Sequence, residues 1–216
     1  MSDTDILDNQ QVREYVQELP DWRIVTGAIS AVFEAKTAAE AIKLFGLIAS
    51  AAEIDNHHPD VDWRYNRLFV STTSHDVGSA LTTRDIALAT KISEHAQNLG
   101  AIARPELISS MEIVIDTDSA EAISAQWAAG LGYTEQDDGS LADPHRRMPA
   151  IWFQKTQSPN PNRLHLDLWK PYSESHAVLD KLDASGATAD HKYAPSCVVI
   201  TDAQGNRFCL CTEKDR

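Results

Sequence analysis

The feature that most constrains the fold is a change of pattern in the middle of the chain, at the segment LGAIARPELISS (99–110). Gly100 and Pro105 interrupt the hydrophobic periodicity there, as residues of turns and linkers do. The elements predicted before this segment follow a different order from those predicted after it. We therefore predict two α+β domains, residues 1–100 and residues 109–216, joined by a linker at residues 101–108.

The first half is predicted to form an antiparallel sheet with helices on one face, because its strands come in neighbouring pairs between helices. The expected helices cover residues 5–19, 37–56 and 82–100, and the expected strands residues 22–26, 28–35, 61–65 and 67–73. Gly27 marks a tight hairpin between the first two strands. Thr37 and Glu40 form a capping-box pattern that opens the second helix.

The second half repeats one order of elements, a strand, a helix and then further strands. The expected strands cover residues 111–117, 150–156, 162–170, 197–202 and 206–211, and the expected helices residues 120–133 and 175–187. The two copies share little sequence, so the repeat is one of structure.

Composition excludes several classes of partner. The net charge of −13 opposes binding to nucleic acid or to an anionic membrane, since both would repel the protein. No apolar run approaches the roughly 20 residues of a membrane span, and the acidic start MSDTDILDNQ is unlike a signal peptide. An odd number of cysteines, 3 in all, favours reduced thiols in a cytoplasmic protein.

Histidines are concentrated in the stretch EIDNHHPDVDWRYNRLFVSTTSH (53–75). Glu53 and His57 are four residues apart on the expected helix, which places them on one face. His75 follows a strand pair that can return it to the same end of the sheet. Such a group of imidazoles and a carboxylate can bind a metal through Glu53, His57 and His75, or it can transfer protons. The simpler interpretation is a helix-capping His57 among surface residues.

Residues 5–100 resemble the pterin-4a-carbinolamine dehydratase family. The matching motifs are Leu19-Pro20-Asp21-Trp22, Glu53-x-x-x-His57-His58-Pro59, Tyr65-Asn66, Thr73-Ser74-His75 and Thr83-Arg84-Asp85. The resemblance implies dehydration of a 4a-hydroxytetrahydropterin by histidine acid–base catalysis, without metal or organic cofactor. Relatives of this fold also serve as dimerisation partners of transcription factors, so a non-catalytic binding module is the alternative. The resemblance also makes a homo-oligomer an open expectation.

The resemblance implies roles for individual residues. His58 and His75 form the expected proton-transfer pair with His57 assisting, and Glu53 orients an imidazole or binds the pterin ring. The expected substrate-binding residues are Pro59, Trp63, Tyr65 and Asp85. Val61 stands where some members carry tryptophan, so an aromatic wall of the pocket is either absent or supplied by Trp63.

Residues 109–212 resemble the glyoxalase-like (vicinal oxygen chelate) superfamily, which is built from two βαβββ modules. The matching stretches are the strand ending in Asp116, Gln126-Trp127 with Leu131-Gly132-Tyr133, Arg163 to Leu168, and Asp202 to Cys209. Metal-dependent members place His, Glu or Gln on four strands, whereas this chain offers Gln154, His165 and, in place of a glutamate, Cys209. The resemblance therefore implies a metal-free pocket that binds a ligand rather than catalysing a reaction.

Overall fold

A computed structural model describes residues 6–157, 163–203 and 205–215. The chain divides into two compact units, Met1–Ile108 and Ser109–Arg216. None of the helices among these residues combines the length and the hydropathy that a membrane crossing requires. The predictions for residues 5 and 162 lie outside the described residues.

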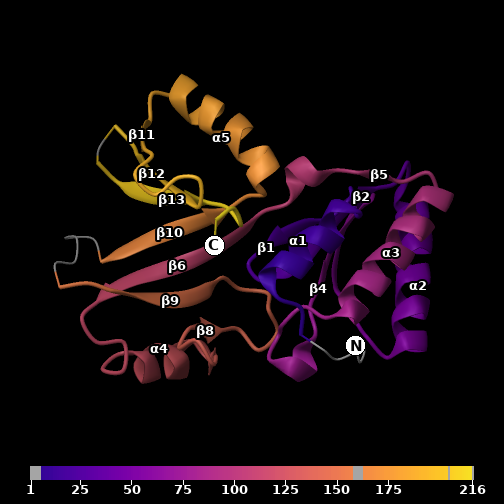
Figure 1. The fold of residues 1–216 in the computed structure, drawn as a ribbon, viewed down its shortest axis with the longest axis horizontal. Helices are drawn as coiled ribbons and strands as arrows, with labels where there is room; N and C mark the ends of the chain where they lie inside the picture. The colour runs from indigo at the N-terminus through magenta and orange to yellow at the C-terminus, as the bar shows by residue number, and fades with distance from the viewer. Residues whose placement is uncertain (1–5, 158–162, 204, 216) are drawn as a thin grey trace. The chain divides into compact units, whose positions relative to one another are not determined.

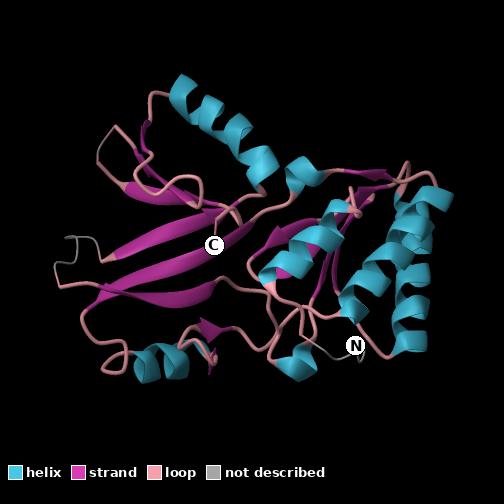
Figure 2. Cartoon of the chain, viewed as in Figure 1, coloured by secondary structure: helices cyan, strands magenta, loops and turns pink. Residues whose placement is uncertain are grey.

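The first unit is an antiparallel sheet packed against helices, as predicted (Figures 1 and 2). Its strands follow the order β1-β2-β4-β3, and β5 pairs with β2. The helices are α1 (Asn9–Gln17), α2 (Ala38–Asp55) and α3 (Thr83–Asn98), with short 3₁₀ turns η1 (His75–Val77) and η2 (Pro105–Leu107). The strands are β1 (Arg23–Val25), β2 (Ala28–Glu34), β3 (Asp60–Arg64), β4 (Arg67–Thr72) and β5 (Ile102–Ala103).

The predicted hairpin at Gly27 is confirmed by the pairing of Val25 with Ala28 across β1 and β2. Thr26 and Gly27 both have positive φ, 46° and 76°. Two successive residues in this region make the tight turn whose twist matches that of the flanking strands. Glycine is the residue that adopts such a φ without steric cost.

One face of the sheet packs against α2 and α3. Alternate residues of β4, Leu68 and Val70, are buried there beside Ile48 of α2 and Leu88 of α3. Because side chains of a strand alternate between faces, Thr72 continues the same buried row at the end of β4. A buried row of apolar residues therefore ends in a hydroxyl, which must find polar partners.

The segment predicted to be a linker packs instead on the first sheet. β5 pairs with Phe33 and Glu34 at the end of β2, beyond the reach of the three-residue β1. The Arg104 backbone N–H donates to the Val32 carbonyl at 2.8 Å, and its guanidinium lies 2.9 Å from Glu34. Backbone groups that β1 leaves unpaired thus gain partners, and this places residues 101–108 in the first unit.

The second unit is one sheet in the order β11-β12-β13-β10-β6-β9-β8-β7. Its strands are β6 (Ser110–Thr117), β7 (Thr134–Glu135), β8 (Leu141–Ala142), β9 (Ala150–Lys155), β10 (Leu164–Trp169), β11 (Thr188–Asp190), β12 (Cys197–Thr201) and β13 (Arg207–Cys211). The helices are α4 (Ser124–Leu131) and α5 (Tyr172–Ala184). The parallel pairs β6–β9 and β10–β13 close two βαβββ modules, which meet along antiparallel β6 and β10. The predicted paired βαβββ fold is confirmed.

The helix predicted at residues 120–133 is shorter in the structure. Residues before Ser124 form turns, with Ile123 N–H bonded to the Ala120 carbonyl at 3.0 Å, and Ile123 supplies no side-chain cap. Gly132, with φ of 72°, ends the helix in the left-handed conformation. The apolar pattern predicted the helix, whereas capping chemistry decides its ends.

Candidate active site

His57 lies just past the end of α2. The helix ends at Asp55, and Asn56 adopts a left-handed φ of 47°, after which the His57 N–H returns to the Ala52 carbonyl at 3.0 Å. The expectation that His57 shares a helical face with Glu53 is therefore wrong, because the left-handed cap redirects the chain before His57. The imidazole of His57 enters the interior of the first unit, where the residue is 5% exposed.

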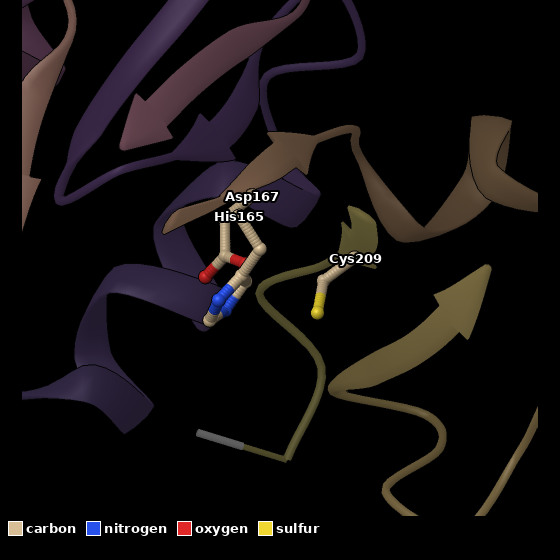
Figure 3. A group of neighbouring side chains, drawn as sticks. All are labelled: His165, Asp167 and Cys209. Atoms are coloured by element: carbon tan, nitrogen blue, oxygen red, sulfur yellow. The ribbon is translucent and has the colours of Figure 1, made fainter. Parts of the chain in front are cut away.

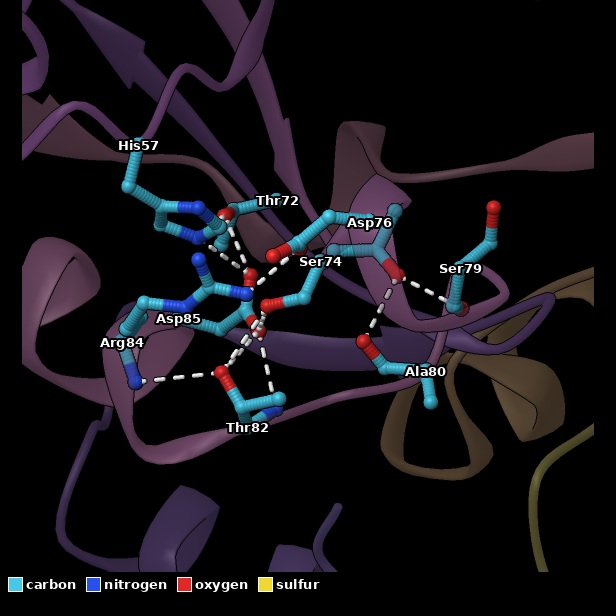
Figure 4. Close-up of polar contacts among 10 residues, drawn as sticks. His57, Thr72, Ser74, Asp76, Ser79, Ala80, Thr82, Arg84 and Asp85 are labelled. Atoms are coloured by element: carbon cyan, nitrogen blue, oxygen red, sulfur yellow. Dashed lines mark hydrogen bonds and ion pairs between the residues drawn. The ribbon is translucent and has the colours of Figure 1, made fainter. Parts of the chain in front are cut away.

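The His57 imidazole is held by the carboxylate of Asp85 (Figure 4). The distance from Nε2 to Oδ1 is 2.8 Å, and the Thr72 hydroxyl donates to the same oxygen at 2.7 Å. Since a carboxylate only accepts, we assign the proton of the neutral ring to Nε2. Nδ1 is then the nitrogen of the neutral ring that can accept a proton.

The second oxygen of Asp85 is held as firmly as the first. Oδ2 accepts from the Ser74 hydroxyl and from the backbone N–H of Thr82, each at 2.8 Å. Asp85 is the third residue of α3 and forms a capping box with Thr82. The start of α3 thus fixes the carboxylate, and the carboxylate fixes the imidazole. Asp85, which was predicted to bind substrate, is 0% exposed, and its carboxylate contacts protein groups, His57 among them.

The other two histidines are exposed. His58 Nε2 lies 3.0 Å from Glu53 Oε1, and both side chains face solvent. His75 begins η1, directly after Ser74, so the segment that carries it is tied to Asp85 through the Ser74 hydroxyl. The candidate site therefore contains one buried imidazole with a fixed tautomer and two exposed imidazoles, which are different environments for proton transfer.

An ion pair accompanies this segment. Arg84, which precedes Asp85 on α3, lies 2.5 Å from the carboxylate of Asp76 in η1. The hydrogen bond from Arg84 holds the pKa of Asp76 below its usual value, and the positive charge of Arg84 acts in the same direction. Asp76 is therefore an anion near neutral pH.

The predicted pocket residues of β3 are not brought to His57. Trp63 pairs with Leu68, which is four residues before Thr72 on β4 and so about 14 Å from it along the strand. Tyr65 lies further still, in the turn after β3, with a positive φ of 56° and an exposed side chain. The Trp63 indole N–H donates to the carbonyl of Tyr65 at 2.5 Å. Of the predicted substrate residues, half-buried Pro59 is the one adjacent to the histidine pair.

The metal-binding alternative for this site is not supported by the geometry. Glu53 is paired with His58, and His57 with Asp85, rather than with each other. Within the described ranges, the group of three potential metal ligands lies in the second unit instead. Sequence reasoning also missed Thr72 as a site residue, although its position in a buried strand row was a usable signal.

In the second unit, two of the predicted ligand positions, His165 and Cys209, lie on neighbouring strands, whereas Gln154 lies on a different strand pair. Gln154 of β9 pairs with Asp116 of β6, whereas His165 lies on β10 and Cys209 on β13. Asp167 belongs to the stretch that carries the resemblance, but it was not predicted to be a ligand. It faces the same side of β10 as His165 and lies directly opposite Cys209.

Comparison with known families agrees with this division. The family model for pterin 4 alpha carbinolamine dehydratase matches residues 5–95, and the model for a glyoxalase-like domain matches residues 112–211. Both resemblances stated from the sequence are confirmed by these matches.

Individual relatives match one unit each. A protein from Nocardia farcinica named "Putative pterin-4-alpha-carbinolamine dehydratase" is 38% identical over 94 residues, which are 44% of this chain and 98% of the relative. A crystal structure of a transcriptional coactivator/pterin dehydratase from Brucella melitensis is 29% identical, with a TM-score of 0.41, over 43% of this chain and 99% of the other. A glyoxalase/bleomycin resistance protein/dioxygenase superfamily member from Vibrio splendidus is 8% identical, with a TM-score of 0.32, over 49% of this chain and 100% of the other.

Proposed function

The chain belongs to the pterin-4a-carbinolamine dehydratase family, with a glyoxalase-like domain after its dehydratase domain, and on this premise we propose that it dehydrates 4a-hydroxytetrahydropterin. The reaction removes the 4a-hydroxyl group as water and a proton from N5, which gives the quinonoid dihydropterin. It therefore needs one acid and one base that work near neutral pH. Such a reaction regenerates a pterin cofactor after a hydroxylation, and we assign the protein to that recycling step.

The observation that carries the proposal is the Asp85–His57 pair beside two exposed histidines. The distance of 2.8 Å between Nε2 and Oδ1 gives His57 a defined tautomer. A carboxylate in this position holds the imidazole in one tautomer and one orientation.

We assign His58 and His75 as the groups that exchange protons with the pterin, since both imidazoles are accessible to a ligand. His57 assists them from its fixed position, and Asp85 is a positioning residue because it acts through His57. Glu53, at 3.0 Å from His58, orients that imidazole. Pro59 is the proposed contact to the pterin ring that lies beside the histidine pair.

The test is a steady-state assay of the full chain with the 4a-carbinolamine, following formation of the quinonoid dihydropterin against the uncatalysed rate. We expect turnover above that rate, and a loss of about 10²–10⁴-fold in kcat for His75→Ala. A full chain that binds the pterin without accelerating its dehydration would refute the proposal. That outcome would favour the alternative, a non-catalytic binding or dimerisation module of the same fold.

A further inference from the structure

A second group of reactive side chains lies on the sheet of the glyoxalase-like domain. His165 and Asp167 alternate on β10 and so face the same side of the sheet. Asp167 pairs directly with Cys209 of β13. One ligand atom from each of the three side chains lies within 4.8 Å of the others (Figure 3).

The Asp167 carboxylate interacts with the thiols of Cys209 and Cys211, but one of its two oxygens is not hydrogen-bonded within the described residues. Asp167 is 3% exposed, and its Oδ1 accepts no hydrogen bond from the part of the chain that the structure describes. The nearest imidazole nitrogen, Nε2 of His165, is 3.7 Å away, beyond hydrogen-bond distance. Buried carboxylate oxygens are normally hydrogen-bonded, paired with a charge or bound to a metal.

A second buried carboxylate, that of Asp116, lies near the other ring nitrogen of His165. Asp116 is 4% exposed, its Oδ1 also accepts no hydrogen bond within the described ranges, and it lies 4.0 Å from Nδ1 of His165. In metal sites a carboxylate on one ring nitrogen orients the histidine, so that the other nitrogen coordinates the ion. Asp116 is placed for this orienting role, and Nε2 of His165 then faces Asp167.

The donor types decide which cation fits. The glyoxalase-like resemblance implies an oxygen-rich site of histidine, glutamate and glutamine, which suits hard divalent ions. This chain instead has a thiol at Cys209 and adds the carboxylate of Asp167 on the neighbouring strand. One sulfur, one imidazole nitrogen and one carboxylate oxygen are the donors that zinc accepts together, and three protein ligands leave a coordination position open.

We propose that Cys209, His165 and Asp167 bind a thiophilic divalent cation, Zn²⁺ being the best fit, with the fourth position left to water or to an oxygen of a ligand. Bond lengths of about 2.3 Å for sulfur and about 2.0–2.2 Å for nitrogen and oxygen place tetrahedral ligand atoms roughly 3.3–3.7 Å apart. The trio therefore has to contract by about 1 Å, which is within the reach of side-chain rotation.

The second unit contains two further thiols, those of Cys197 and Cys211, with which the role of Cys209 can be compared. Cys197 of β12 pairs with Cys211 of β13, and the Cys211 thiol donates to the Cys197 sulfur at 3.3 Å. Both thiols also interact with the thiol of Cys209, so single substitutions are needed to decide which of the three sulfurs binds the cation. Cys197 is half-buried, which makes Cys197→Ser a thiol-removing control with little loss of packing.

The experiment is a titration of the reduced full-length protein with Co²⁺, followed by the near-ultraviolet band of thiolate bonded to cobalt, and then competition with Zn²⁺. We expect one equivalent to bind, the band to disappear in Cys209→Ser, and Cys197→Ser to keep it. Asp167→Asn, which preserves shape, should weaken Zn²⁺ affinity at least about tenfold, and Asp116→Asn should weaken it about 10–100-fold.

Three outcomes would overturn the proposal. The first is the absence of a thiolate band in the wild-type protein at one equivalent of Co²⁺. The second is a thiolate band that persists in Cys209→Ser. The third is a thiolate band that is lost in Cys197→Ser. Either result would mean that a thiol other than that of Cys209 binds the metal. Unchanged Zn²⁺ affinity in Asp167→Asn would separately exclude the Asp167 carboxylate as a ligand of the metal. Circular dichroism of each variant shows that the fold is kept.

Discussion

Nε2 of His57 lies 2.8 Å from Oδ1 of Asp85, and Asp85 reaches this position because it is the third residue of α3. An acidic residue at the third position of a helix commonly stabilises the start of that helix. Here the same residue, Asp85, also binds the imidazole of His57. The two roles share one carboxylate, whose oxygens accept from His57, Thr72, Ser74 and Thr82. Stability of the first domain and reactivity of its site are therefore coupled.

Asp85→Asn is the variant that separates these two contributions. The amide nitrogen would donate toward Nε2, which reverses the tautomer of His57 and protonates Nδ1. We expect kcat to fall about 10²–10⁴-fold and the free energy of unfolding to fall by about 1–3 kcal/mol. Asp76→Asn is the control. It also removes one negative charge, but from the exposed carboxylate that pairs with Arg84. Equal kcat in the two variants would contradict the role of Asp85.

The two exposed histidines are expected to be needed for turnover but not for folding. His58→Ala and His75→Ala should each lower kcat by about 10²–10⁴-fold with unfolding midpoints near that of the wild type, because neither imidazole is buried. His191→Ala, an exposed histidine of the second unit, is the control and should leave kcat unchanged. Wild-type turnover in His75→Ala would remove it from the site.

Asn56 is expected to place His57 through its backbone conformation. With φ of 47°, it occupies the left-handed region that asparagine and glycine tolerate better than other residues. Asn56→Ala should lower the free energy of unfolding by about 1 kcal/mol, whereas Asn56→Gly should be nearly neutral. Chemical denaturation of both variants checks this, and equal losses would mean that the side chain of Asn56 rather than its φ matters.

Glu34 is expected to make stability depend on acid pH. Hydrogen bonds from Arg104 and Arg67 lower the pKa of Glu34. Since the folded-state pKa is below the unfolded one, the stabilisation is present above the unfolded value and is lost as pH falls through the folded value. Glu34→Gln should therefore unfold at lower denaturant than the wild type at pH 7, and the difference should shrink below about pH 4. A difference that persists at the acid end would refute this origin.

The first unit is expected to fold by itself when it retains β5. A fragment of residues 1–108 should fold cooperatively and keep the kcat of the full chain. A fragment of residues 1–100 lacks the β5 pairing and the Arg104–Glu34 contact, so its unfolding midpoint should be lower. Equal midpoints would mean that residues 101–108 are the linker that the sequence pattern predicts. A lower kcat for residues 1–108 would instead indicate that the second domain contributes to the site.

The sequence by itself determined the two-domain division, the hairpin at Gly27 and the repeated order of elements in the second half. These depend on local chemistry: hydrophobic period, turn residues and caps act over a few residues and can be read along the chain. It also indicated His57 and His58, because adjacent histidines before a proline are unusual, and His75, because it follows the next strand pair. The sequence did not predict how residues 101–108 pack. β5 pairs with the part of β2 that the short strand β1 leaves unpaired, and this contact is not visible in a local pattern.

Only the tertiary structure decided which side chains meet. Asp85 is 28 residues from His57, and Asp167 is 42 residues from Cys209, so no local pattern links either pair. The left-handed turn at Asn56 separated Glu53 from His57, and the strand register separated Trp63 from the histidines. Contacts between distant segments depend on how strands pair and how helices begin. A residue type and its spacing show what chemistry a chain carries, but only the assembled sheet and helices determine where its groups converge.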